Sequence, residues 1–295
     1  MIKLIKKFLI LQIVLGLFFL ILLGGTIFLI KNYFTPLPQL SSYSQEQIKK
    51  PDNISSLKAK VPILTYHHIK KTKPEDNQTE KILSISPEVF EQQMKVLKAL
   101  GYQPIWLKDL YKALFYGEKL PERPIVITFD DGYKDNFQNA FPILKKYNFK
   151  ATFFVIPQKV GSSGYMSWEE LEIMRDSGME IQSHTFSHSH LNELKGDFAF
   201  KELSESKKAI EAKLKVPVYF ISWPYGIYNE ELIMLAQKAG YLGGVSLHYG
   251  LWQAPDNIFE MFRVEIRGDK DYRLYRFLAK IWGFNYKEIL KKLFY

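Results

Sequence analysis

The sequence contains no cysteine among its 295 residues. This absence excludes disulfide bonds, cysteine nucleophiles and thiolate metal sites, so any metal must be bound by histidine and carboxylate side chains. It does not identify the compartment, because many exported bacterial proteins also lack cysteine. Internal repeats and low-complexity tracts are absent as well, and an apolar content of 47% excludes a mostly disordered chain.

The net charge of +9 is concentrated at the two ends of the chain. Residues 1–60 carry +6 and residues 270–295 carry +5, which leaves −2 for residues 61–269. A protein that binds nucleic acid is expected to carry its basic excess on its folded surface. The distribution therefore argues against nucleic acid as a partner and favours proximity to the cytoplasmic membrane.

A run of 23 residues without charge extends from Phe8 to Ile30. As a helix it would measure about 34 Å, enough to span the apolar core of a bilayer. Lysines are more frequent before the run than just after it, so the positive-inside rule places residues 1–7 in the cytoplasm and the rest of the chain outside. A cleaved signal peptide is the alternative, although its apolar region is usually only about 7–15 residues long. We expect a single-pass anchor in the cell membrane, followed by a proline-containing linker at 31–60.

Short apolar runs alternate with amphipathic stretches from residue 61 onward. The runs VPILTYHHI, PIVITFDDG, KATFFVI, MEIQSH, VYFISWP and YLGGVSLH predict strands. Helices are predicted between them, one capped by Ser86, one opened by a capping box from Ser167 to Glu170, and one kinked or restarted at Pro142. Wholly apolar strands that alternate with helices predict an α/β fold with a parallel sheet, open or closed into a barrel.

Polar residues follow several of these predicted strands. His67, the pair Asp130-Asp131, His184 and the pair Pro224-Tyr225 all stand where a strand ends. Because sites in parallel α/β folds lie at the carboxyl ends of the strands, we expect these residues to share one face.

Two histidines and an aspartate form a candidate metal site. His184 and His188 are four residues apart, a spacing that would put both imidazoles on one side of a helical turn. Asp131 would complete a set of two histidines and one carboxylate, with open positions for water and substrate. Two adjacent carboxylates repel each other unless a cation intervenes. A metal on Asp131 would remove that repulsion and leave Asp130 to act as general base toward a water held by the metal.

The motifs TFDDG, SHTFSH and WPYG, in this order and with this spacing, resemble those of the polysaccharide deacetylases of carbohydrate esterase family 4, which share the NodB-homology domain. The resemblance covers about residues 61–267, and LTYHHI and RVEI look closest to the branch that deacetylates poly-N-acetylglucosamine. It implies a distorted (β/α) barrel that hydrolyses N-acetyl groups of sugar polymers with a divalent metal. It also implies that Asp130 is the catalytic base and that Asp131, His184 and His188 are the metal ligands. Tyr225 matches the residue whose backbone N–H helps hold the oxyanion.

The chain departs from the family pattern at two positions. Many members have an arginine that supports the base where this chain has Ser222, and Arg263 is the candidate to supply that charge from elsewhere. Many members also have a late histidine as general acid. His248 in VSLHYG and His67 in TYHH are the two candidates for that role, and without a general acid the leaving amine would depart slowly.

Further side chains near these motifs are candidates for contact with the sugar. They are Tyr133, Trp168, Trp223 and Pro224. Aromatic faces stack on pyranose rings, although packing in the core would account for either tryptophan equally well. We expect His68 and His190 to be structural or solvated residues.

Residues 270–295 form a basic, amphipathic tail. The apolar residues of its first half fall on one helical face, namely Leu274, Phe277, Leu278, Ile281 and Trp282. Arg273, Arg276 and Lys280 fall on another face. Either the tail consists of helices that pack on the barrel, or it forms an interfacial helix on anionic lipid.

The sequence thus predicts a membrane-anchored, outward-facing hydrolase that removes N-acetyl groups from a polysaccharide containing N-acetylglucosamine. The expected cofactor is one divalent metal, zinc or else cobalt or nickel. Peptidoglycan and chitin oligomers are alternative substrates, and a catalytically idle glycan-binding module on the same fold is the alternative from another class. A glycosidase is disfavoured, because its carboxylates stand about 5–10 Å apart across a sugar. The sequence does not identify a polysaccharide synthase as a partner in the membrane.

Overall fold

The computed structural model describes residues 57–283. The predicted membrane anchor at 8–30, nearly all of the predicted linker and the last twelve residues of the basic tail lie outside this range. Within it, no helix is both long enough and apolar enough to cross a bilayer.

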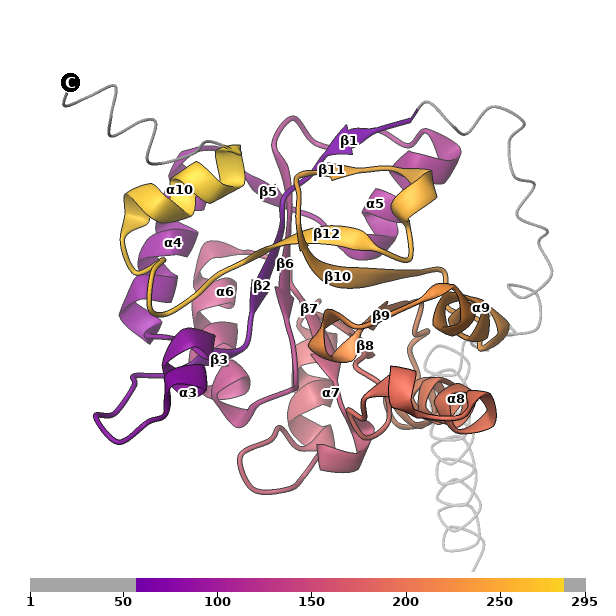
Figure 1. Ribbon diagram of the computed structural model, residues 1–295. Coiled ribbons are helices and arrows are strands. Elements are labelled where there is room, and N and C mark those ends of the chain that lie inside the picture. Colours follow the sequence, from indigo (N-terminus) through magenta and orange to yellow (C-terminus); the bar gives the residue numbers. More distant parts are fainter. Residues whose placement is uncertain (1–56, 284–295) are drawn as a thin grey trace, which may run out of the picture. The chain divides into compact units, whose positions relative to one another are not determined.

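Seven parallel strands close into a barrel (Figure 1). In spatial order they are β2 (Ile63–Tyr66), β12 (Met261–Glu265), β10 (Gly243–Tyr249), β9 (Phe220–Ser222), β8 (Glu180–Ser183), β7 (Thr152–Val155) and β6 (Pro124–Phe129). Strand β6 pairs back to β2, with Val126 opposite Ile63 and Phe129 opposite Tyr66, which closes the ring. A short strand, β5 (Gln103–Pro104), adds to the beginning of β6. The predicted α/β barrel is confirmed.

Helices surround the barrel (Figure 1). They are α3 (Gln78–Leu83), α4 (Pro87–Ala99), α5 (Leu107–Tyr116), α6 (Phe141–Tyr147), α7 (Trp168–Asp176), α8 (Gly196–Leu214), α9 (Glu230–Lys238) and α10 (Leu274–Trp282). Two predicted starts are confirmed, because Ser86 caps α4 and Ser167 forms a capping box with Glu170 at α7. Pro142 stands at the start of α6, directly after a π-helical stretch at Asn136–Ala140, so the expected restart at this proline is also confirmed.

Aromatic packing fixes the strands beneath the candidate site. The rings of Phe129 on β6 and Phe153 on β7 stack at 4.6 Å, and Phe129 also stacks on Tyr66 of β2 at 5.4 Å. Phe90 of α4 packs edge-on against Tyr66, whose hydroxyl donates to Gln93. All five side chains are buried. The strand ends that carry the catalytic candidates therefore rest on a close-packed aromatic layer, which restricts their movement.

The compact fold continues beyond residues 61–269. Strand β1 (Ala59–Lys60) pairs with β11 (Trp252–Gln253), and a second small sheet joins β3 (His68–Ile69) to β4 (Ser84–Ile85). Phe277 and Ile281 of α10 are buried in the main core. The first half of the basic tail is thus a helix that packs on the barrel.

Candidate active site

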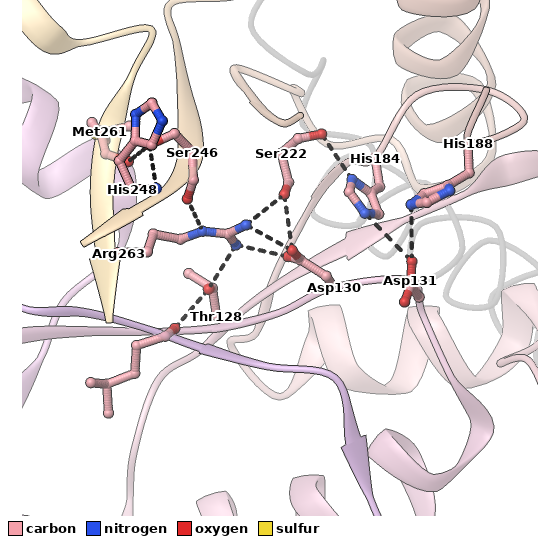
Figure 2. A network of polar contacts seen from close by, with 11 residues as sticks. Thr128, Asp130, Asp131, His184, His188, Ser222, Ser246, His248, Met261 and Arg263 are labelled. Carbon is pink, nitrogen blue, oxygen red and sulfur yellow. Dashed lines mark hydrogen bonds and ion pairs between the residues drawn. The ribbon is translucent and has the colours of Figure 1, made fainter. Parts of the chain in front are cut away.

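Asp130 stands at the end of β6 inside a buried network of polar groups (Figure 2). Arg263 of β12 donates from Nη1 to Oδ1 at 2.9 Å and from Nη2 to Oδ2 at 2.8 Å. The hydroxyl of Ser222 on β9 donates to Oδ2 at 3.0 Å. Both carboxylate oxygens are therefore held by groups from two other strands, and the arrangement is the bidentate geometry in which arginine binds carboxylates best.

Arg263 is itself fixed in place. Its Nε donates to the carbonyl of Ser246 at 2.7 Å, its Nη1 lies 3.4 Å from the hydroxyl of Thr128, and the side chain is 1% exposed. Burial would raise the pKa of Asp130, but the adjacent guanidinium outweighs burial and holds that pKa below its ordinary value. Asp130 is consequently ionised at neutral pH although it is shielded from water.

Asp131 points away from this pair and toward two histidines (Figure 2). Its Oδ1 lies 3.4 Å from Nε2 of His184 and 3.4 Å from Nε2 of His188. One ligand atom from each of the three residues lies within 4.8 Å of the others, and they form a group able to hold a metal ion. Burial opposes the charge on Asp131, but the bond to His184 lowers its pKa well below the ordinary value.

The two imidazoles are prepared to act as ligands through Nε2. His184 Nδ1 lies 2.8 Å from the carbonyl of Ser222, which fixes the tautomer with a proton on Nδ1 and leaves Nε2 to accept. Burial and the neighbouring His184 lower the pKa of His188 to about 4, so its ring is neutral at pH 7, the form that binds metals. A carboxylate and two imidazoles suit zinc and similar divalent ions.

The loop that carries both histidines is not helical, and that part of the sequence prediction was wrong. His184 follows β8, and the chain then passes through left-handed backbone at Thr185 (φ 62°) and His188 (φ 66°). The hydroxyl of Thr185 accepts from the N–H of His188 at 3.1 Å. The N–H and hydroxyl of Ser187 donate to the carboxylate of Glu202 on α8 at 2.8 and 2.7 Å. The imidazoles meet because side chains hold this loop, not because of helical periodicity.

Strained backbone is concentrated at this site. Six residues other than glycine have positive φ within residues 57–283, and four of them belong to the site: Asp131, Thr185, His188 and Tyr225. Such conformations cost on the order of 1–3 kcal/mol each and persist only where the surrounding structure enforces them. Gly132, next to Asp131, also has positive φ, and a Cβ there would lie 3.2 Å from Val155. These backbone conformations lower the stability of the fold, and they orient the side chains of the site.

The structure separates the two candidates for the general acid. The partly buried imidazole of His67 interacts electrostatically with Asp130, Asp131 and Arg263. Burial lowers the pKa of His67 below its ordinary value, and the two carboxylates offset this only in part. His248 is exposed, and its Nδ1 lies 3.1 Å from the hydroxyl of Tyr228. In Figure 2 it lies beyond Arg263, on the far side from the metal-site residues, so the expectation that His248 takes part in the site is not met.

The four candidate sugar contacts also differ in how far they are exposed. Trp223 is 1% exposed and its Nε1 donates to the carbonyl of Phe259, so it is a core residue and its assignment as a sugar contact was wrong. Pro224 is also buried, which excludes an exposed sugar-binding surface on its ring. Trp168 is partly buried against the core, and Tyr133 is partly buried with its ring stacked on His68 at 3.6 Å.

Aromatic rings line the exposed side of the metal site. The ring of Tyr225 is half exposed, packs edge-on against His188 at 4.6 Å, and stacks parallel to His190 at 3.9 Å. His190 is therefore paired with an aromatic ring rather than with the metal-site residues. The sequence indicated Ser222 only as the position of the missing arginine and did not predict its hydrogen bond to Asp130. It did not point to Ser246 and Glu202, since nothing in their local pattern differs from ordinary strand or surface residues.

Comparisons with known proteins agree with this geometry. The sequence profile of the polysaccharide deacetylase family matches residues 117–244. The poly-beta-1,6-N-acetyl-D-glucosamine N-deacetylase of Staphylococcus aureus is 30% identical over 250 residues, covering 76% of this chain and 84% of that protein. YxkH of Bacillus subtilis is 35% identical over 226 residues, covering 75% of this chain and 78% of that protein. The chain belongs to the polysaccharide deacetylases.

Solved structures support the same assignment. The deacetylase PplD of Streptococcus pyogenes, determined in complex with acetate, aligns with a TM-score of 0.70 and 28% identity, covering 76% of this chain and 99% of that one. A polysaccharide deacetylase of Bacillus cereus aligns with a TM-score of 0.67 and 30% identity, covering 76% and 69%. Polysaccharide deacetylases of carbohydrate esterase family 4 are hydrolases that use a divalent metal, and Asp131, His184 and His188 fit one.

We expect the metal affinity of this deacetylase to depend on His188 and not on His190. Removing a residue that merely orients a ligand weakens metal binding about 10–100-fold, so loss of a direct ligand should cost at least about a hundredfold. Competition titration of zinc against a chelator would measure this in His188→Ala. The control His190→Ala should bind zinc like the unmodified chain, and equal losses in both variants would contradict the assignment.

Arg263→Met should destabilise the fold by about 3–5 kcal/mol, because it leaves the Asp130 carboxylate buried without a partner. The double variant Asp130→Asn/Arg263→Met should be less destabilised than Arg263→Met alone, since no uncompensated charge remains. Urea unfolding of both variants and of Asp130→Asn measures the coupling between the two residues. Strictly additive costs would show that the ion pair contributes no specific interaction.

Proposed function

We propose that this polysaccharide deacetylase removes N-acetyl groups from an extracytoplasmic polymer that contains N-acetylglucosamine. The observation that carries the proposal is the separation of two adjacent carboxylates. Asp130 is bound by Arg263 and Ser222, whereas Asp131 faces His184 and His188. The two adjacent aspartates therefore have different roles, Asp130 as the base and Asp131 as a metal ligand.

Asp130 retains one site at which it can accept a proton. A carboxylate has about four lone-pair positions. Arg263 occupies one on Oδ1, and Arg263 and Ser222 occupy two on Oδ2, which leaves one position on Oδ1. A water held next to this oxygen can be deprotonated there as it attacks the amide carbon. Arg263 keeps the resting carboxylate ionised, so the base is ready at neutral pH.

Asp131, His184 and His188 would hold the metal through Oδ1 and the two Nε2 atoms. When bound, a divalent ion supplies a Lewis acid that acidifies water and polarises the amide carbonyl. The backbone N–H of Tyr225, set by the left-handed turn at this residue, is the proposed donor to the oxyanion. His67 is the proposed donor of a proton to the leaving amine, because it shares the electrostatic surroundings of Asp130 and Asp131.

Relatives support the choice of substrate. The Staphylococcus aureus relative is named for poly-beta-1,6-N-acetyl-D-glucosamine, so we propose that polymer class before peptidoglycan or chitin oligomers. The catalytically idle module loses its main support. It rested on Ser222 in place of the usual arginine and on the unassigned general acid, and Arg263 supplies the positive charge from another strand. The apolar run at 8–30 supports a membrane-anchored enzyme with its barrel outside the cell.

Acetate release from N-acetylglucosamine oligomers tests the proposal directly. After treatment with chelator the chain should be inactive, and zinc, cobalt or nickel should restore release. Asp130→Asn should lower kcat by about 10²–10⁴-fold while zinc remains bound, because it removes the proton acceptor and leaves Asp131, His184 and His188 in place. Asp197→Asn, an exposed aspartate on α8, is the matched control and should be fully active. A folded, metal-loaded chain that releases no acetate would favour the idle module.

The general acid is identified by comparing two histidine variants. His67→Asn should lower kcat by at least about a hundredfold, whereas His248→Asn should stay within about twofold of the unmodified enzyme. Zinc titration of both variants separates loss of proton transfer from loss of metal. The reverse ranking of the two kcat values would assign the role to His248.

A further inference from the structure

The catalytic residues and the ends of the described chain lie at opposite ends of the barrel. Asp130, His184 and Ser222 stand at or just after the carboxyl ends of β6, β8 and β9. A hollow of about 430 Å³ lies instead beside Pro62 and Pro124, at the amino ends of β2 and β6. Because the strands are parallel, these two sets of residues occupy opposite rims of the barrel.

Both ends of the described chain reach this second rim. Lys60, just after the chain enters the fold, pairs with Trp252 across β1 and β11. The ammonium of Lys60 donates to the carbonyl of Trp282 at the end of α10, and the hydroxyl of Tyr249 donates to the carbonyl of Lys280 at 2.9 Å. Figure 1 shows β1, β11 and α10 in the same upper part of the molecule.

The surface around these contacts combines aromatic and basic side chains. Tyr249 is 58% exposed, Trp252 56% and Trp282 38%, and exposed Lys60 and Arg123 lie beside them around the hollow. Glu122 is the acidic residue that lines the hollow. We call Lys60, Arg123, Tyr249, Trp252 and Trp282 the anchor face. Tryptophan and tyrosine beside lysine and arginine suit the headgroup layer of a bilayer, where the rings enter the interface and the cations meet anionic lipid.

We infer that the anchor face rests on the surface of an anionic bilayer and that the catalytic rim therefore points away from the membrane. The inference rests on the proposed membrane anchorage. The described fold begins just before Lys60 and ends just after Trp282, both at this rim, and the apolar run at 8–30 and Lys287, Lys291 and Lys292 lie in the sequence beyond these two ends. A bilayer that holds the proposed anchor is therefore the partner that we assign to this aromatic and basic face. A polymer emerging from the membrane would meet the catalytic rim on the outward side.

The absence of cysteine allows a direct test with single-cysteine labels on the full chain. A fluorophore is attached at Glu122→Cys on the rim of the anchor face, or at exposed Ser163→Cys in the loop before α7 at the catalytic rim. Each protein is reconstituted into vesicles of phosphatidylcholine with phosphatidylglycerol. A quencher in the lipid should quench position 122 several-fold more than position 163, and a water-soluble quencher should show the opposite order.

Charge reversal tests the role of the lipid. Lys60→Glu/Arg123→Glu should abolish the difference between the two labels, because two basic groups near an anionic surface together strengthen contact by on the order of tenfold or more. Lys201→Glu/Lys213→Glu on α8 makes the same charge change elsewhere and should preserve it. Vesicles of phosphatidylcholine alone should reproduce the effect of reversing Lys60 and Arg123.

The outcomes distinguish this inference from the proposed function. Acetate release from soluble oligomers should be unchanged in Lys60→Glu/Arg123→Glu, since neither residue touches the catalytic rim. Equal quenching at positions 122 and 163 in anionic vesicles would overturn the inference even if the enzyme is active. Failure of the full chain to enter vesicles would overturn it as well, whereas inactivity with strong quenching at position 122 would contradict only the proposed function.

Discussion

The site depends on the buried ion pair between Arg263 and Asp130. A carboxylate and a guanidinium removed from water are stable only when their geometry is good and the remaining polar atoms are satisfied. Here Ser222, Ser246 and Thr128 contact the pair, so contributions from four strands meet in one network. The same contacts that make burial tolerable also fix the direction in which Asp130 presents its remaining acceptor position. Stability and chemistry therefore rely on one set of bonds.

Asp131, the residue next to Asp130, shows how backbone conformation gives two identical side chains different roles. Asp130 extends from the end of β6, and the left-handed conformation of Asp131 turns its carboxylate toward the histidines. The carbonyl of Ser222 orients His184 while the hydroxyl of the same residue binds Asp130. Ser222 thus contacts both the metal-site group and the base.

The barrel also separates two surfaces with different chemistry. One rim carries the charged catalytic groups and exposed aromatic rings such as Tyr225, whereas the other carries the aromatic and basic anchor face. A closed parallel barrel is a stiff spacer between them, because its strands are packed against the surrounding helices through stacked rings such as Phe129 and Phe153. This stiffness lets contact at one rim set the direction in which the other rim faces.

The sequence alone determined six of the seven barrel strands and most of the helices, because apolar runs and caps such as Ser86 are local signals that packing did not override. It did not predict β12, which carries Arg263. It also placed Asp130, Asp131 and His184 at strand ends, since parallel α/β folds bring carboxyl ends together, and it joined His188 to them by its spacing from His184. Only the tertiary structure decided which partner each residue has. Arg263 reaches Asp130 across 133 positions of sequence, Trp223 turns inward although it adjoins the site, and His248 faces Tyr228. These choices depend on side-chain direction and on contacts between distant strands, which no local pattern in the chain records.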